Sequence, residues 1–240
     1  MSLIFSNIDA VIVDLDGTMV DTVGDFCVAL NLMLRDLPAP FNAYLIDQPT
    51  VSQMIGKGSE HLIKSVLKHV KSSKEAINSG AKPLLGNTLD ALFEPAWLSY
   101  QANYRSVNGQ NAIVFSGVLA GLQQLKAHGV RLACLTNKPT DFAVALLKEK
   151  GLASFFEHTF GGDAFEHKKP HPLPLLKTCE AMGSQAHRTL MVGDSSNDAQ
   201  AARAAGCPVV LVTYGYNHGE PIQSVDADGV LDSLEDLVLV

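Results

Sequence analysis

Short apolar segments alternate with helix-like segments through the second half of the chain. Segments 131–135, 189–192 and 209–212 are rich in apolar residues. Apolar runs of this length are typical of strands that are buried on both faces of a parallel sheet. The helices expected between them end at Gly151 and Gly206, because glycine is favoured just after a helix C-terminus. The alternation predicts an α/β fold built on a doubly wound parallel sheet.

A long insert separates the first predicted strand from the rest of this pattern. Segment 8–13 predicts a strand, and the alternation resumes only near Val114. The segments with helical patterns in between are 21–37, 56–70 and 88–105. Loops between a strand and the next helix usually have about 2–6 residues, so the insert is too long for a loop. We expect residues 1–18 and 112–240 to form an α/β core domain and residues 19–111 to form a helical cap domain.

Composition narrows the class of protein. The 240 residues are 47% hydrophobic, which is enough for one sizeable core and a small second domain. The net charge of −7 disfavours nucleic acid and anionic membranes as partners. The four cysteines form no CxxC pair, and the N-terminus has no signal-peptide pattern. We expect a cytoplasmic protein that binds neither nucleic acid nor a membrane.

Polar residues follow the predicted strands at the points where each strand ends. These residues are Asp14, Asp16, Thr136, Asn137, Lys169, Asp194 and Asp198. The carboxyl ends of parallel strands open on one edge of a doubly wound sheet, which is where ligands bind. We therefore expect these side chains, although distant in sequence, to meet in one crevice.

The carboxylates in this crevice require a positive partner. Side chains two residues apart in extended backbone, as in Asp14 and Asp16, point to the same side. Two charges ~4 Å apart repel each other by several kcal/mol at an effective dielectric constant of ~20. Lys169 alone does not offset three carboxylates, whereas Mg²⁺ binds carboxylates together with phosphate oxygens. One carboxylate would attack phosphorus and its neighbour would transfer protons, while Thr136 and Lys169 would hold phosphate oxygens.

Four short motifs then indicate a family. They are Val13-Asp14-Leu15-Asp16-Gly17-Thr18, Leu135-Thr136-Asn137-Lys138, Lys169-Pro170-His171-Pro172 and Gly193-Asp194-Ser195-Ser196-Asn197-Asp198. In order and spacing they resemble the four motifs of the haloacid dehalogenase superfamily across nearly the whole chain. The insert resembles the α-helical cap that follows the first motif in that family.

The resemblance implies roles for the acidic residues. Asp14 would be the nucleophile, and Asp16 the general acid and base that also binds the metal through its backbone carbonyl. Asp194 would be the second side-chain metal ligand. Asp198 would support the metal shell, although a carboxylate in the first turn of a helix is also expected as a cap.

Two further stretches resemble the bacterial phosphoglycolate phosphatases. They are Ile55-Gly56-Lys57-Gly58 and Thr213–Glu220. The implied reaction is the hydrolysis of 2-phosphoglycolate to glycolate and phosphate. The expected partner is therefore a small phosphorylated metabolite, and the expected protein is a monomer or homodimer. Lys57 is a candidate ligand of the substrate carboxylate, with a solvated lysine as the alternative. Asn137 is either a substrate ligand or a turn residue.

Other functions stay open at this point. The core motifs do not separate a sugar-phosphate phosphatase, a pyrophosphatase or a β-phosphoglucomutase-like enzyme, because the cap selects the substrate. A dehalogenase would lack the second carboxylate, Asp16. A phosphorylated receiver module would have about 120 residues, near the usual size of one domain, and no helical insert. A catalytically silent binding protein would be expected to have lost Asp14 or Lys169.

Overall fold

The computed structural model describes residues 3–73 and 89–240. Within these ranges the chain forms two compact units, one made of Met1–Asp21 and Ile113–Val240 and the other of Thr22–Ala112. The second unit, Thr22–Ala112, lies where we expect the cap domain of residues 19–111. That this unit acts as a cap stays a prediction.

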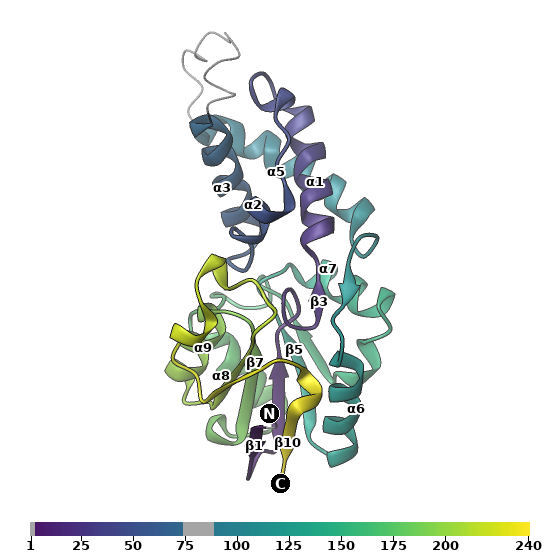
Figure 1. The fold of residues 1–240 in the computed structure, drawn as a ribbon, viewed down its shortest axis with the longest axis vertical. Coiled ribbons are helices and arrows are strands. Elements are labelled where there is room, and N and C mark those ends of the chain that lie inside the picture. The colour runs from purple at the N-terminus through teal and green to yellow at the C-terminus, as the bar shows by residue number, and fades with distance from the viewer. Residues whose placement is uncertain (1–2, 74–88) are drawn as a thin grey trace. The chain divides into compact units, whose positions relative to one another are not determined.

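The first unit is built on a six-stranded parallel sheet with the strand order β6-β5-β2-β7-β8-β9. Its strands are β6 (His158–Phe160), β5 (Arg131–Leu135), β2 (Ala10–Val13), β7 (Thr189–Gly193), β8 (Val209–Val212) and β9 (Gly229–Leu231). Figure 1 shows β5, β2 and β7 in the middle of the unit. The predicted strand at 8–13 is shorter at its start, whereas the strands at 131–135 and 209–212 have the expected bounds.

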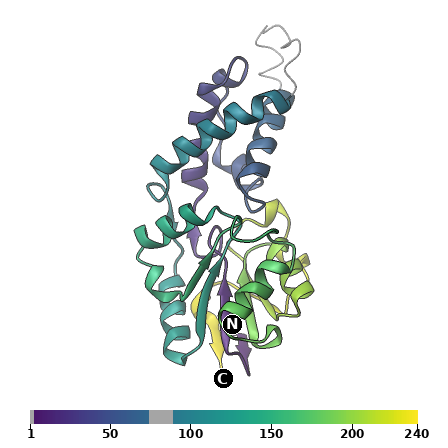
Figure 2. The same cartoon turned by 180° about the vertical axis from the view of Figure 1, so that it is seen from behind.

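The central strands are continuous apolar segments because both of their faces are buried. Every residue of β2, β7 and β8 is buried, because helices cover both faces of the sheet. These helices are α6 (Val118–His128), α7 (Thr140–Glu149), α8 (Leu173–Ala181) and α9 (Ser196–Ala205). The core on one face joins Ile12 and Met191 of the sheet to Leu175 of α8 and Ala202 of α9. Figures 1 and 2 show α6 and the α8–α9 pair on opposite sides of the sheet. The predicted doubly wound α/β fold is confirmed.

Two short ladders lie outside the main sheet. Strand β1 (Leu3–Phe5) pairs in parallel with β10 (Leu237–Leu239), and β3 (Val20–Asp21) pairs antiparallel with β4 (Ile113–Val114). The second ladder joins the two places where the chain leaves and re-enters the α/β unit. Neither ladder was expected, because two or three residues carry no readable periodicity. The short 3-10 helices are η1 (Phe41–Ala43), η2 (Ala153–Phe155), η3 (Ala186–Arg188), η4 (Asn217–Gly219), η5 (Ile222–Ser224) and η6 (Leu234–Asp236).

The second unit is helical in its described part. Its α-helices are α1 (Val23–Asp36), α2 (Gln48–Ser52), α3 (Ser59–Ser72) and α5 (Leu89–Val107). Helix α1 packs on α5, where the rings of Phe26 and Tyr104 stack with centroids 5.2 Å apart. The buried carboxylate of Asp25 accepts hydrogen bonds from the backbone N–H groups of Gly109 and Asn111, at 2.6 and 2.7 Å. Among the described residues of the chain, no helix has the length and apolar character to cross a bilayer.

Candidate active site

The register of the central strands brings Asp14 and Asp194 together. Val13 of β2 aligns with Cys134 of β5 on one side and with Val192 of β7 on the other. Asp14 follows this level by one residue and Asp194 follows it by two, so both lie at the carboxyl edge of the sheet. Both side chains are buried. The parallel pairing itself therefore sets their proximity.

Three carboxylates form one cluster at this edge. One oxygen each from Asp14, Asp194 and Asp198 lies within 4.8 Å of the other two. Asp198 reaches the cluster from the first turn of α9, which begins directly after β7. Asp16 is not part of this group. Such a set of buried oxygens is the donor chemistry that Mg²⁺ prefers.

Glycines make room for this cluster. A Cβ atom built on Gly17, whose φ is +85°, would lie 2.2 Å from Asp194 Oδ2. A Cβ on Gly215 would lie 2.1 Å from the Cβ of Asp194, and one on Gly193 would lie 2.3 Å from Asp198 Cγ. Atoms cannot approach this closely, so any side chain at these three positions would displace a carboxylate. Gly193 and Gly215 are needed for close approach, and Gly17 is needed both for close approach and for its positive φ angle.

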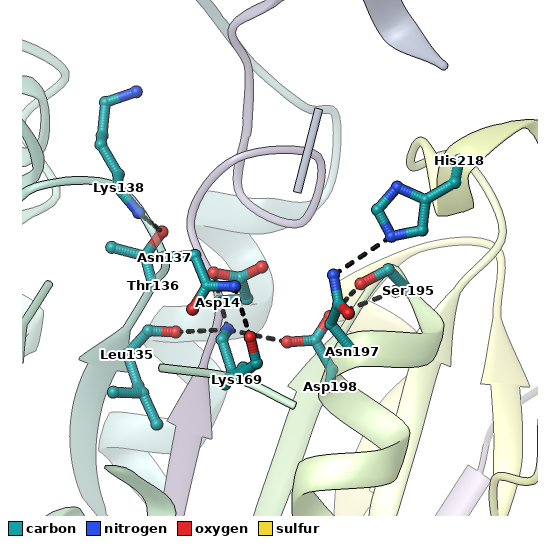
Figure 3. A network of polar contacts seen from close by, with 10 residues as sticks. All are labelled: Asp14, Leu135, Thr136, Asn137, Lys138, Lys169, Ser195, Asn197, Asp198 and His218. Carbon is teal, nitrogen blue, oxygen red and sulfur yellow. Dashed lines mark hydrogen bonds and ion pairs between the residues drawn. The ribbon is translucent and has the colours of Figure 1, made fainter. Parts of the chain in front are cut away.

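Lys169 links the cluster to the sheet. Its Nζ atom lies 3.0 Å from Asp14 Oδ1 and donates hydrogen bonds to Asp198 Oδ1 and to the carbonyl of Leu135, both at 2.7 Å. Figure 3 shows the three acceptors around the ammonium group. Burial lowers the pKa of Lys169, but the negative charges of Asp14 and Asp198 outweigh it and raise the pKa above its usual value. The lysine is therefore a fixed positive charge beside Asp14.

Burial changes the acidity of two members of the cluster. Loss of hydration, aided by the charges of Asp198 and Asp16, raises the pKa of Asp14 to about 7 despite the opposing charge of Lys169. Burial and the nearby carboxylates also raise the pKa of Asp194 well above its usual value. Both carboxyl groups thus hold protons more strongly than exposed aspartates, as expected where like charges share a site with too little positive charge.

Asp198 has two structural roles. Its Oδ2 accepts hydrogen bonds from the backbone N–H and the hydroxyl of Ser195, at 3.2 and 2.8 Å, which makes a capping box at the start of α9. Its Oδ1 holds Lys169. The capping role, which the sequence left as a rival to metal support, is therefore present, and it coexists with a place in the acidic cluster.

A second buried ion pair was not anticipated from the sequence. Lys138 Nζ lies 2.8 Å from Asp16 Oδ1, and the side chains are 1% and 10% exposed. Lys138 follows Thr136 and Asn137 at the start of the loop before α7. The position of Lys138 in the second motif indicated that it could lie near the site. The sequence does not predict which carboxylate its long side chain contacts.

The charges of the site match a divalent cation. Counted as ionised, the four carboxylates exceed the two lysine ammonium groups by two charges. Among the described residues, protein groups engage Oδ1 of Asp14 through Lys169 and Oδ2 of Asp194 through the backbone N–H of Tyr216. The other oxygen of each of these two carboxylates is left for a cation. The donor set and its charge therefore fit Mg²⁺.

Thr136 and Asn137 lie at the end of β5. The Thr136 hydroxyl is buried and accepts a hydrogen bond from the backbone N–H of Lys138 at 3.2 Å. The Asn137 side-chain amide donates a 2.8 Å hydrogen bond to the carbonyl of Lys169. Asn137 thus ties the loop after β5 to the segment that carries Lys169, which supports a structural role. Its predicted contact with substrate stays a prediction.

Lys57 belongs to the helical unit. It is exposed and lies between Gly56 and Gly58, whose φ angles are +109° and +87°, just before α3. Its predicted contact with the substrate carboxylate stays a prediction.

The loop after β8 closes one side of the acidic cluster. The backbone N–H of Tyr216 donates to Asp194 Oδ2 at 2.8 Å, and its hydroxyl donates to Asp21 Oδ1 at 2.7 Å. The hydroxyl of Tyr214 donates to the carbonyl of Thr18 at 3.0 Å. Sequence reasoning singled out this loop only by resemblance, and its tie to Asp194 is a backbone contact that side-chain types do not reveal.

Comparison with known proteins places this geometry in a family. The family model described as haloacid dehalogenase-like hydrolase matches residues 8–206. A phosphoglycolate phosphatase from Thiobacillus denitrificans is 42% identical over 233 residues, which is 97% of this chain and 95% of the relative. A phosphoglycolate phosphatase from Nitrosospira multiformis is 39% identical over 95% of this chain and 92% of its own.

A solved structure with a similar description also matches this chain over most of its length. The crystal structure of a predicted phosphoglycolate phosphatase from Haemophilus somnus superimposes with a TM-score of 0.84. It is 31% identical in sequence, and the match covers 96% of each chain. The similarity therefore includes the helical segments as well as the parallel sheet.

Proposed function

Because the chain belongs to the haloacid dehalogenase-like hydrolase family, we propose that it hydrolyses a small phosphomonoester, 2-phosphoglycolate, to glycolate and inorganic phosphate. The observation that carries the proposal is the buried contact between Lys169 and Asp14 within the acidic cluster. The two relatives named above, both phosphoglycolate phosphatases that cover at least nine-tenths of this chain, support the choice of substrate.

Asp14 is the nucleophile in this proposal. Its carboxylate oxygen attacks phosphorus, the bond from phosphorus to the ester oxygen breaks, and Asp16 gives its proton to that oxygen as glycolate leaves. Asp16 then takes a proton from water, whose oxygen attacks the aspartyl-phosphate. This step releases inorganic phosphate and regenerates the carboxylate of Asp14.

The remaining groups bind and orient the phosphate. The Lys169 ammonium and the Thr136 hydroxyl hold phosphate oxygens, and Lys169 also favours the ionised form of Asp14 and holds its carboxylate in place. Asp14, Asp194 and the Asp198 shell would hold Mg²⁺, with the Asp16 carbonyl as the expected further ligand. When bound, the ion neutralises charge on the phosphoryl group. The presence of Asp16, the second carboxylate of the first motif, distinguishes the site from a dehalogenase site, in which that carboxylate would be absent.

A phosphate-release assay tests the proposal. Its panel contains 2-phosphoglycolate, glucose 6-phosphate, β-glucose 1-phosphate and pyrophosphate, each with Mg²⁺ and with a chelator. We expect the highest kcat/KM for 2-phosphoglycolate and loss of activity with the chelator. A hexose phosphate or pyrophosphate as the best substrate would refute the substrate assignment.

The Asp14→Asn variant is the matched control for the chemistry. It keeps the size of the side chain, and we expect kcat to fall by at least about 10⁴-fold, as for other nucleophile deletions, while circular dichroism stays unchanged. Near-normal turnover by this variant would contradict the role given to Asp14, whatever the best substrate proves to be.

A further inference from the structure

The site contains two buried lysines that serve different carboxylates. Lys169 contacts Asp14 and Asp198, which are members of the acidic cluster. Lys138 contacts Asp16, which is outside that cluster. The two positive charges therefore divide the site into a phosphate side, around Asp14, and a second side, around Asp16.

The second side is where the leaving group must lie. A general acid acts from about 2.6–3.2 Å, so Asp16 has to contact the ester oxygen that it protonates. In 2-phosphoglycolate a single methylene joins that oxygen to the carboxylate carbon. An ammonium group in contact with Asp16 therefore lies within reach of the carboxylate of the substrate.

We propose that Lys138 binds the carboxylate of the substrate and is the residue of the α/β unit that selects phosphoglycolate over neutral esters. The inference rests on the proposed function and adds the group that recognises the part of the substrate that does not react. Lys138 Nζ lies 2.8 Å from Asp16 Oδ1, and the incoming carboxylate joins Asp16 as an acceptor of this ammonium group.

Burial gives this contact its selectivity. The side chain of Lys138 is 1% exposed, so water competes little for its ammonium group. A charge pair formed in such a place is far stronger than one on the surface. A substrate of the same length but with a neutral tail leaves this cation with less compensation, which penalises the wrong ester as well as favouring the right one. Lys57, the carboxylate ligand considered from the sequence, is exposed.

The test compares two substrates that differ only in the recognised group. They are 2-phosphoglycolate and 2-hydroxyethyl phosphate, in which a hydroxymethyl group replaces the carboxylate. Removing Lys138 also breaks its ion pair with Asp16, but this loss affects both substrates and cancels in the ratio of their kcat/KM values. We expect Lys138→Met to lower that ratio by at least about 30-fold, as is typical when one member of a buried charge pair is deleted.

Three further variants complete the experiment. Lys138→Gln keeps a donor for Asp16 and is used in the same way if the methionine variant does not fold. Lys138→Arg keeps the charge, and we expect it to retain most of the ratio. Lys177→Met removes a surface lysine that pairs with Glu180 at 2.8 Å, and it should leave the ratio unchanged.

The outcomes separate this inference from the proposed function. An equal fall for both substrates would overturn the inference and would make Lys138 only a positioning residue for Asp16. A ratio that collapses in Lys57→Met but not in Lys138→Met would also overturn it. If the wild-type enzyme hydrolyses other phosphate esters but does not prefer 2-phosphoglycolate, the substrate assignment itself fails.

Discussion

The phosphate side and the leaving-group side of the site are built differently around their lysines. The Lys169 ammonium group contacts two carboxylates and the Leu135 carbonyl. The side chain of Asn137 also donates a hydrogen bond to the backbone carbonyl of Lys169. Lys138 pairs with Asp16, which lies outside the acidic cluster. The first lysine is held in several directions and suits a constant task, the binding of phosphate. The second contacts the proposed general acid and suits a group that meets the part of the substrate that does not react.

The difference predicts that the two lysines do not contribute equally to stability. In Lys169→Met, Asp14 and Asp198 both lose a buried partner, and breaking a buried pair costs about 3–5 kcal/mol. We expect the free energy of unfolding, measured in urea, to fall by that amount and phosphate release to fall by at least about 10³-fold. Lys138→Met should lose less stability because the carboxylate that it leaves behind, Asp16, is 10% exposed, whereas Asp198 is 1% exposed. Equal losses in the two variants would contradict the comparison.

Mg²⁺ is expected to stabilise the phosphate side in a pH-dependent way. The pKa of Asp14 is raised to about 7, so between pH 4 and 7 the folded protein holds a proton that the unfolded chain has lost. Without a cation, this group's contribution to stability therefore falls as the pH rises through that range. The ion binds the ionised carboxylate, so its stabilising effect should grow from pH 5.5 to pH 8.

Thermal unfolding with Mg²⁺ and with chelator measures this effect. Mg²⁺ at 100 times its dissociation constant adds about 2.7 kcal/mol to the free energy of unfolding, which raises Tm by several degrees. Asp14→Asn is the control, and the increment in Tm at pH 8 should shrink in it. An increment that is the same at both pH values would show that Asp14 does not take part in binding the ion.

The smallest expected effect concerns the loop that closes the phosphate side. Tyr216→Phe removes the hydroxyl that binds Asp21 but keeps the backbone N–H that binds Asp194. We expect a loss of stability of about 1 kcal/mol and a change in kcat of less than about 3-fold. Tyr214→Phe is the matched control, since its hydroxyl binds the backbone of Thr18. A loss of activity above tenfold in Tyr216→Phe alone would show that the hydroxyl, and not only the backbone, supports the site.

The same comparison explains what the sequence can and cannot predict. Asp14 and Asp194 were predictable because each follows a buried apolar strand, and parallel strands end at a common edge. The pairing of Lys138 with Asp16 was not, because a long flexible side chain has many directions open to it. The ladder between β1 and β10 was also missed, since it joins three-residue segments from opposite ends of the chain.

Boundaries show the same limit in the helical unit. The expected helix at 56–70 begins instead at Ser59, because Gly56 and Gly58 both have positive φ angles and precede α3. The expected helix at 21–37 begins at Val23, since Asp21 pairs with Ile113 in the β3–β4 ladder. Local sequence patterns therefore locate these helices. Their first residues depend on backbone angles, as for α3, or on pairing with a distant segment, as for α1.

Trapping the covalent intermediate tests the central claim, that the carboxylate of Asp14 attacks phosphorus. The enzyme is quenched in acid during turnover of 2-phosphoglycolate with Mg²⁺ and reduced with borohydride, which converts an aspartyl-phosphate to homoserine. The account predicts homoserine at position 14 in the peptide spectrum, and none in Asp14→Asn. Homoserine at position 16, or full turnover with no modified residue, would contradict it.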